Sequence, residues 1–474
     1  MAPSKDPRLI LARDGGPLHR QMYDYFRTAI SAGQLRPGDR LPSARTLAQQ
    51  LMVARGTVDA AYAMLAGEGY VIGRRPSGTI VSPGLLGVER APATSKPRPR
   101  HAPTLVLTGA AKPFQLGLPA VDAFPRKLWS RLIARQGRDL SAADMGYPEH
   151  AGYRPLREAI AAYLAVARGM LCDARQIVIT SGYQGALDTI GRVLLRRGDK
   201  VWFEDPGYHL ARAALERWGV PLVPVRVDAD GLRVADGVAR AHDARLAIVT
   251  PSHQAPLGVA LSLPRRLALL AWASEAGAYV VEDDYDGEFR YTGRPLPALK
   301  SLDRADRVLY AGSFSKVLFP GLRLGYLVLP EELVEAFNNI ILSRSAGAST
   351  FEQRVVATFM REGYFARHLK RMRSLYAARR QALAEALSAV FGERLAVDLE
   401  PGGMHLLARV GGGVRDTDLA RKAQAAGFAI DALSSRVIRY RREGALLLGF
   451  SNIPEADAVT MCRRLEHAIG ADLI

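Results

Sequence analysis

The sequence has little cysteine, no long apolar run and fewer acidic than basic side chains. Only Cys172 and Cys462 occur among 474 residues, which excludes a disulfide framework and is typical of a reducing compartment. No uninterrupted apolar run approaches the length of a membrane span, and residues 1–14 lack the apolar core of a signal peptide. We therefore expect a cytoplasmic protein with no membrane partner. Its hydrophobic content of 48% is typical of globular domains whose cores need no cross-links.

The shortage of acidic residues is concentrated near the N-terminus. The whole chain has 64 Lys+Arg against 47 Asp+Glu, a net charge of +17. Residues 1–100 hold 15 Lys+Arg and 7 Asp+Glu, a balance of +8. A basic block of this kind favours a polyanionic partner such as DNA, although solubility alone would also account for it.

Residues 17–82 carry the pattern of three helices followed by two short strands. Apolar residues recur at helical spacing, and Ser43 suits the N-cap of the second helix. The expected elements are a helix ending at Gly33, helices over 44–51 and 55–66, and strands over 70–72 and 79–81. The buried face of the third helix is expected to be Val58, Ala61, Tyr62 and Leu65. This order predicts a winged helix-turn-helix, for which we set the domain limits at 1–82.

Residues 83–111 are expected to be a linker, because 91–100 are rich in proline and basic residues and poor in apolar ones. A loop within one domain is less favoured, because the segment is longer than ordinary loops. From 112 to 474, short apolar strands alternate with amphipathic helices, which predicts an α/β domain with a mostly parallel sheet. Its strands are expected over 176–180, 200–204, 245–250, 278–283 and 307–311. A smaller α+β lobe is expected from about 335 to 474.

Four short motifs in the N-terminal domain resemble the GntR family of winged-helix regulators. They are Leu41 to Ala48, Val53 to Val58, Ala61 to Leu65 and Glu68 to Tyr70. The resemblance implies binding of double-stranded operator DNA, with the start of the third helix in the major groove. The expected DNA contacts are Ser43, Arg45, Arg55 and Thr57 on the helices, and Arg74, Arg75, Gly78 and Thr79 in the wing. Ala54 replaces a capping Ser or Thr, and Asp59 is acidic where a DNA contact is usual.

Lys316 follows two small hydroxyl residues and precedes an arginine, in Ser313 to Lys316 and Pro320 to Arg323. A lysine amine held near neutrality forms a Schiff base with an aldehyde cofactor. Hydroxyls and an arginine bind a phosphate on the same cofactor. The pattern points to pyridoxal phosphate, although the tetrapeptide alone is also found on solvated surfaces. No zinc-ligand spacing is present, so we expect no metal.

Further segments provide groups that such a cofactor needs. Asp283 and Tyr285 follow a buried strand, where a carboxylate would keep the pyridine nitrogen protonated and a phenol would lie near the 3-oxygen. The strand-to-helix turn with Gly182, Tyr183 and Gln184 offers backbone N–H groups to a phosphate. Tyr208 is either a stacking ring or a core tyrosine. His253 or Gln254 is placed to reach the 3-oxygen.

In this order, the motifs resemble the fold-type I aminotransferases over about 112–474. The resemblance implies that Lys316 is the Schiff-base lysine, Asp283 the pyridine-nitrogen partner and Tyr285 the 3-oxygen partner. It also implies a phosphate grip by Ser313, Ser315 and Arg323, and a homodimer in which Tyr147 reaches the neighbouring subunit's phosphate. A substrate carboxylate would need an arginine in the C-terminal lobe. Arg436 is the best candidate, although Ser435 lies nearer the expected position and a surface role for Arg436 stays open.

A GntR-type head, a linker and an aminotransferase-like body together resemble the MocR subfamily of bacterial regulators, which implies a head-to-tail dimer. The leading hypothesis is a transcriptional regulator that senses pyridoxal phosphate, or an amino compound forming an external aldimine, at Lys316. The alternative is a working aminotransferase with an accessory DNA-binding head. Because the carboxylate clamp is uncertain, we expect any transaminase activity to be weak.

Overall fold

The computed structural model describes residues 11–12, 16–74, 78–84, 111–293, 296–344, 349–411 and 413–473. It divides into two compact units, Met1–Leu107 and Thr108–Ile474, which we call the head and the body. Among the described residues, no helix is both long enough and apolar enough to cross a bilayer.

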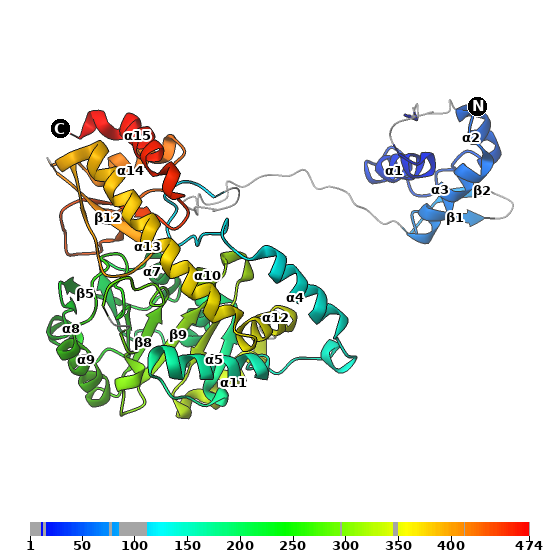
Figure 1. Cartoon of the computed structure of the whole chain (residues 1–474). Helices are drawn as coiled ribbons and strands as arrows, with labels where there is room; N and C mark the ends of the chain where they lie inside the picture. The colour runs from blue at the N-terminus through cyan, green and yellow to red at the C-terminus, as the bar shows by residue number, and fades with distance from the viewer. Residues whose placement is uncertain are drawn as a thin grey trace. The chain divides into compact units, whose positions relative to one another are not determined.

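The head is a winged helix-turn-helix (Figure 1). It consists of α1 (Leu18–Ser31), α2 (Ala44–Leu51), α3 (Arg55–Gly67), β1 (Val71–Arg74) and β2 (Gly78–Val81). The two strands pair antiparallel. The expected face of α3 is buried against α1, where Met22 and Phe26 lie in the same core. The apolar spacing therefore predicted the core of the head correctly.

The starts of α2 and α3 differ in their capping. The Ser43 hydroxyl accepts a hydrogen bond from the Thr46 amide at 3.1 Å, so one of the unpaired N–H groups of α2 is satisfied. Ala54 stands at the same place before α3 and provides no side-chain cap. Helix α3 thus lacks the roughly 1 kcal/mol that a side-chain cap contributes. The missing cap at Ala54 was predicted from the sequence.

An eight-stranded sheet forms the centre of the body, in the order β3-β10-β9-β8-β7-β4-β5-β6. Its strands are β3 (Ile177–Thr180), β4 (Val201–Asp205), β5 (Leu222–Asp228), β6 (Gly231–Leu232), β7 (Leu246–Val249), β8 (Tyr279–Asp284), β9 (Val308–Ser313) and β10 (Gly325–Val328). Neighbours pair in parallel from β9 to β5, whereas β10 is antiparallel to β9 and β3, and β6 is antiparallel to β5. Strands β3, β4, β7, β8 and β9 were expected from the sequence. These five strands run in the same direction, so their carboxyl ends share one edge of the sheet.

Helices cover this sheet. They are α4 (Arg126–Arg138), α5 (Arg154–Arg168), α6 (Gly182–Leu194), α7 (His209–Arg217), α8 (Val234–Ala241), α9 (Leu263–Glu275), α10 (Phe314–Val317), α11 (Val334–Arg344) and α12 (Thr350–Arg361). α11 packs on α6, and α12 packs on α4 and α5.

The C-terminal lobe contains a four-stranded antiparallel sheet in the order β11-β12-β14-β13. Its elements are α13 (Tyr364–Phe391), β11 (Leu395–Asp398), β12 (His405–Val410), α14 (Asp416–Ala425), β13 (Asp431–Ala432), β14 (Ala445–Gly449) and α15 (Ala458–Ile469). The long helix α13 runs from the lobe, where it packs on α15, to α12 (Figure 1).

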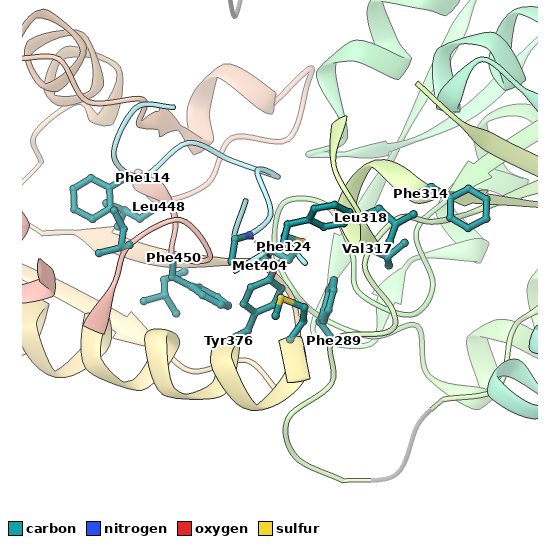
Figure 2. Close-up of a cluster of buried hydrophobic side chains, with 14 of the residues drawn as sticks. Phe114, Phe124, Phe289, Phe314, Val317, Leu318, Tyr376, Met404, Leu448 and Phe450 are labelled. Atoms are coloured by element: carbon teal, nitrogen blue, oxygen red, sulfur yellow. Dashed lines mark hydrogen bonds between the residues drawn. The ribbon is translucent and has the colours of Figure 1, made fainter. Parts of the chain in front are cut away.

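A buried aromatic cluster joins the lobe to the segment that carries Lys316. In Figure 2, Phe289 lies beside Tyr376 of α13, with Phe450, after β14, on one side of this pair and Val317 and Leu318 on the other. The rings of Phe289 and Tyr376 lie 4.8 Å apart, edge to face, and the Tyr376 hydroxyl accepts a hydrogen bond from the Ala120 amide at 2.9 Å. The hydrophobic core is therefore continuous from the C-terminal lobe to α10.

Candidate functional site

The candidate site lies where the parallel strands of the body end. β4 ends at Asp205, β8 at Asp284 and β9 at Ser313, all at the same edge. Ligands of open α/β sheets bind at this edge, because loops there collect side chains from several strands.

Lys316 lies on the single turn α10, directly after β9. Its Nζ donates a hydrogen bond to the Gly117 carbonyl at 2.8 Å. A Cβ on Gly117 would lie 2.3 Å from Nζ, so a side chain at residue 117 would displace the amine from this position. Burial lowers the pKa of the Lys316 amine, against the opposing effect of the Asp286 and Asp283 carboxylates. The lowered pKa shifts Lys316 toward the neutral amine that a carbonyl-reactive lysine requires.

Asp283 is a buried carboxylate at the end of β8. Burial raises the pKa of its carboxyl well above the usual value, and the nearby Tyr183 hydroxyl opposes this rise. Within the part of the chain that the structure describes, Asp283 forms no ion pair with a Lys, Arg or His side chain. A cationic ring nitrogen beside it would supply the missing opposite charge.

Tyr285, His253 and Asp286 form a short polar chain next to Asp283. The Tyr285 hydroxyl and His253 Nδ1 are 2.9 Å apart, and His253 Nδ1 is 3.1 Å from Asp286 Oδ2. Burial, with the charges of Asp286 and Asp283, raises the pKa of the Tyr285 phenol well above its usual value. The phenol is therefore protonated and can donate a hydrogen bond to an oxygen in the site. Asp286 was not predicted, although it lies one residue beyond Tyr285.

The start of α6 provides backbone N–H groups near the same edge. Gly182 has φ +73°, and Ser181 makes no side-chain cap to the helix. Arg323 is exposed at the turn before β10 and also has a left-handed backbone. Ser313 Oγ accepts a hydrogen bond from the Ser315 amide at 3.2 Å. Uncapped N–H groups, two hydroxyls and an exposed guanidinium are the donor set that a phosphate ester needs.

Tyr208 begins α7, and its ring centroid lies 6.2 Å from that of Tyr183. Burial raises the pKa of the Tyr208 phenol to about 12, with a smaller contribution from Asp283 in the same direction and an opposing one from Arg436. Tyr208 therefore lies within electrostatic range of both residues, and its partly buried ring also packs against the hydrophobic core of the sheet. Gln184, by contrast, is exposed.

Gln254 does not face the site and instead bonds to groups that support it. Its Nε2 donates hydrogen bonds to Glu204 Oε2 at 3.1 Å and to the Pro206 carbonyl at 2.9 Å. Glu204 also accepts a hydrogen bond from the Thr250 hydroxyl at 2.6 Å. Burial raises the pKa of Glu204 to about 7. Of the two residues considered for the 3-oxygen, His253 is therefore the one that faces Tyr285.

Asp205 connects the sheet to the C-terminal lobe, and the sequence gave no reason to single it out. Its carboxylate accepts three backbone hydrogen bonds, from Ile438 at 2.8 Å, Arg439 at 2.7 Å and Tyr440 at 2.9 Å. This contact fixes the segment after Arg436 against the end of β4. Its partners lie more than 230 residues away, so no local signal could reveal it.

Arg436 is buried in a short turn after β13. Its Nη2 pairs with Asp431, whereas Nη1 has no hydrogen-bond partner among the described residues. Burial lowers the pKa of Arg436 to about 10, with an opposing effect of Tyr208. Ser435 is exposed and its hydroxyl bonds back to the Ala432 carbonyl at 2.6 Å. Arg436, and not Ser435, is therefore the side chain of this turn that is available to a buried anion.

Asp284 points to the opposite side of β8 from Asp283. It pairs with the buried Arg168 and accepts a hydrogen bond from the Tyr310 hydroxyl at 2.5 Å. Glu282 likewise accepts hydrogen bonds from the Leu299 amide at 2.7 Å and from the Lys300 amide at 2.9 Å. Strand alternation explains why these two acids turn away from the site, whereas their partners depend on the folded chain. Tyr147 is fully exposed and faces no group of its own site.

In the head, Arg45 and Arg55 are exposed at the starts of α2 and α3, and Thr57 is partly buried. Arg55 Nε lies 3.4 Å from Asp59 Oδ2, one helical turn on. Gly78 begins β2 with φ +82°, and Thr79 follows it. The side chain of Arg74 and all of Arg75 lie outside the described residues.

The body's geometry fits pyridoxal phosphate. Lys316, whose pKa is lowered by burial, matches the aldehyde of that cofactor. The buried Asp283 carboxylate matches the ring nitrogen, and the uncapped start of α6 matches the phosphate.

Comparison with known proteins agrees with this geometry. The family described as aminotransferase class I and II matches residues 127–452, and the gntR family of bacterial regulatory proteins matches residues 18–81. The chain is 38% identical to the "Probable rhizopine catabolism regulatory protein MocR" of Rhizobium meliloti, over 94% of this chain and 92% of that one. It is 34% identical to the pyridoxine biosynthesis regulator PdxR of Corynebacterium glutamicum, over 81% and 82%.

The body also resembles solved enzymes. It matches the kynurenine aminotransferase of Pyrococcus horikoshii with a TM-score of 0.70 and 29% identity, over 77% of this chain and 92% of that one. The chain thus belongs to the MocR subfamily of GntR-type bacterial transcriptional regulators, in which a DNA-binding head is joined to an aminotransferase-like body that uses pyridoxal phosphate.

Proposed function

We propose that Lys316 is the covalent anchor of pyridoxal phosphate and that the occupied site controls binding of the head to operator DNA. The observation that carries the proposal is the convergence of Lys316, Asp283 and the Tyr285–His253 pair at one edge of the sheet. When bound, the cofactor supplies an aldehyde that reacts with primary amines. This chemistry allows the body to distinguish amines from other small molecules.

Each residue of the site has a proposed role toward the cofactor. Asp283 holds a proton at the pyridine nitrogen, and Tyr285 donates to the 3-oxygen while His253 orients the phenol. The phosphate is bound by the N–H groups of Gly182, Tyr183 and Gln184 and by the side chains of Ser313, Ser315 and Arg323. Tyr208 packs on the ring. Tyr147, which is fully exposed here, contacts the phosphate of a second subunit in a head-to-tail homodimer.

The signal is proposed to be pyridoxal phosphate itself or an amine that competes for the same aldehyde. The relative named for pyridoxine biosynthesis supports the first. The unpartnered Nη1 of Arg436 supports an amino compound with a carboxylate, because that atom can donate a charge-assisted hydrogen bond. Either ligand must bind two states of the body with different affinity to change the head.

In the head, we propose that Arg45 and Arg55 contact DNA through α2 and α3. Thr57 and Ser43 position these helices through contacts with the DNA backbone. The wing, which includes Gly78 and Thr79, brings Arg74 and Arg75 to the minor groove. Because its partner is DNA, the protein is proposed to act in the cytoplasm.

Transamination is the second candidate function. The lowered pKa of Lys316 favours it, because a neutral amine can also transfer protons. The pairing of Arg436 with Asp431 weakens it, since a bidentate carboxylate clamp would need the whole guanidinium. We expect keto-acid formation well below about 1 per second, a rate typical of slow enzymes.

The anchor is tested with Lys316→Ala in the full-length protein. The variant is expected to lose the visible absorbance of lysine-bound cofactor completely, because no other amine lies at that position. Lys112→Ala, at an exposed lysine, serves as the control and should keep the absorbance. Retention of the band in Lys316→Ala would overturn the assignment.

A further inference from the structure

A second cavity lies beside the cofactor site, between the large sheet and the C-terminal lobe. It has a volume of about 210 Å³. Its wall includes the loop after β7 with residues 252–253 and 258–260, residues 286–287 and 289–290 after β8, and the turn 400–403 before β12. Lys316, Asp283 and Tyr208 are not part of its lining. The cavity is therefore separate from the position of the proposed anchor.

Buried polar groups without partners face this cavity. Asp286 is 1% exposed; its Oδ2 lies 3.1 Å from His253 Nδ1, and its Oδ1 has no hydrogen-bond partner among the described residues. Ser252 Oγ and Arg290 Nε are likewise buried and unpartnered. Leaving such groups unsatisfied costs roughly 1–3 kcal/mol each, so several of them around one cavity indicate a ligand that satisfies them.

The charges of the lining define that ligand. Asp286 and Glu400 are acidic and Arg290 is basic, while the second lining arginine, Arg168, is already paired with Asp284. An ammonium group matches the unpartnered Oδ1 of Asp286, and a carboxylate matches the unpartnered Nε of Arg290. The cavity volume leaves room for a small amino acid. We propose that this cavity binds a small amino-acid zwitterion non-covalently.

The walls of the cavity are held together by backbone hydrogen bonds. The Gly403 amide donates to the Phe289 carbonyl at 2.9 Å, and the Tyr291 amide donates to the Pro401 carbonyl at 2.8 Å. The Tyr291 hydroxyl bonds to the Gly403 carbonyl at 2.6 Å. The cavity is thus formed before a ligand enters, and a ligand in it bridges the sheet and the lobe.

His253 connects this second cavity to the cofactor site. Its Nδ1 lies 3.1 Å from Asp286 Oδ2 and 2.9 Å from the Tyr285 hydroxyl. One ring nitrogen lies near both groups, so an ammonium that binds Asp286 changes the contact between His253 and Tyr285. Because His253 also lines the cavity, a ligand there affects the hydroxyl proposed to bind the 3-oxygen.

The test uses full-length protein whose cofactor has been reduced onto Lys316 with borohydride, so that amines no longer exchange there. Calorimetric titration is performed with glycine, alanine and serine, and with ethylamine and propanoate as single-charge controls. At least one amino acid is expected to bind, at least 10-fold more tightly than either control. Asp286→Asn and the cavity-filling Ala260→Leu should each weaken binding at least 10-fold, whereas Asp243→Asn, at an exposed ion pair, should not.

A second variant separates this site from the proposed carboxylate clamp. Arg436→Ala is expected to leave binding to the reduced protein unchanged. Absence of amino-acid binding, undiminished binding in Ala260→Leu, or loss of binding in Arg436→Ala but not in Asp286→Asn would overturn the proposal. The absorbance of the reduced cofactor and the melting temperature show that each variant is folded.

Discussion

The head and the body place their functional side chains in opposite settings. In the head, Arg45 and Arg55 stand exposed on adjacent helices of one short segment. In the body, Lys316, Asp283 and Tyr285 come from loops and strand ends that only the folded sheet brings together, and burial shifts the pKa of each. The first arrangement suits a large polyanion, whose attraction depends on salt. The second suits a small reactive molecule, because burial sets the protonation of the groups around it.

The largest effect is expected when charged side chains are removed from the head alone. Arg45→Ala combined with Arg55→Ala is expected to weaken operator binding by about 30- to 1000-fold, since each base or phosphate contact contributes roughly 1–2 kcal/mol. The salt dependence of binding should fall by about one counterion for each arginine that contacts a phosphate. Fluorescence anisotropy at several salt concentrations measures both quantities.

The visible absorbance of the bound cofactor should be unchanged in this double variant. Arg20→Ala, at an exposed arginine of α1, serves as the matched control and should bind DNA normally. Loss of cofactor together with DNA binding would contradict the separation of the two functions.

The second largest predicted effect concerns a carboxyl group that is buried in the body. Glu204 has a pKa raised to about 7 by burial, from 4.5 in the unfolded chain, so the folded protein holds a proton that the unfolded chain releases. This group's contribution to stability is fully present below pH 4.5 and is lost as the pH rises through 7. Glu204→Gln keeps the neutral shape and should gain up to about 3 kcal/mol over wild type between pH 4.5 and 8.

Urea unfolding followed by tryptophan fluorescence measures this change in the body alone, because all four tryptophans, at 129, 202, 218 and 272, lie there. Glu385→Gln, at an exposed helical position, is the control and should show no such pH dependence. A difference between Glu204→Gln and wild type that is the same at both pH values would refute the role of burial.

The smallest predicted effect refines the description of the head. Asp59 lies 3.4 Å from Arg55 on the exposed face of α3, and such surface pairs contribute under about 1 kcal/mol. Asp59→Asn frees Arg55 and removes a charge that repels phosphate, so operator affinity should rise about 2- to 5-fold. Asp24→Asn, which breaks a similar pair with Arg27 on α1, should leave DNA affinity unchanged when both are compared by anisotropy at low salt.

The sequence was most informative where structure is local. The bounds of α2, the buried face of α3 and the missing cap at Ala54 followed from spacing and residue type alone. The ion pair of Arg55 and Asp59 also has a local signal, the i,i+4 spacing, which the sequence analysis did not use. For the body, apolar runs predicted five strands of the large sheet but not β5, β6 or β10. The antiparallel direction of β10 depends on its pairing with β3 and β9.

The contacts that escaped prediction join distant parts of the chain. Asp205 binds three amides of residues 438–440, and Asp286 faces a cavity closed by the turn 400–403. Each residue type has many possible partners, and only the packing of the lobe on the sheet selects one. The residues proposed for the cofactor were found more easily, because a lysine, an aspartate and a tyrosine at fixed places follow from the chemistry of the cofactor.

The central claim is that the buried site of the body controls the exposed charges of the head. It is tested most directly by operator affinity of the wild type and of Lys316→Ala, each with and without pyridoxal phosphate, on DNA selected from a random pool. The account predicts that the cofactor changes wild-type affinity at least 5-fold, the lower end of ordinary allosteric coupling, and leaves the affinity of Lys316→Ala unchanged. Equal wild-type affinities with and without cofactor, and with added amino compounds, would contradict it.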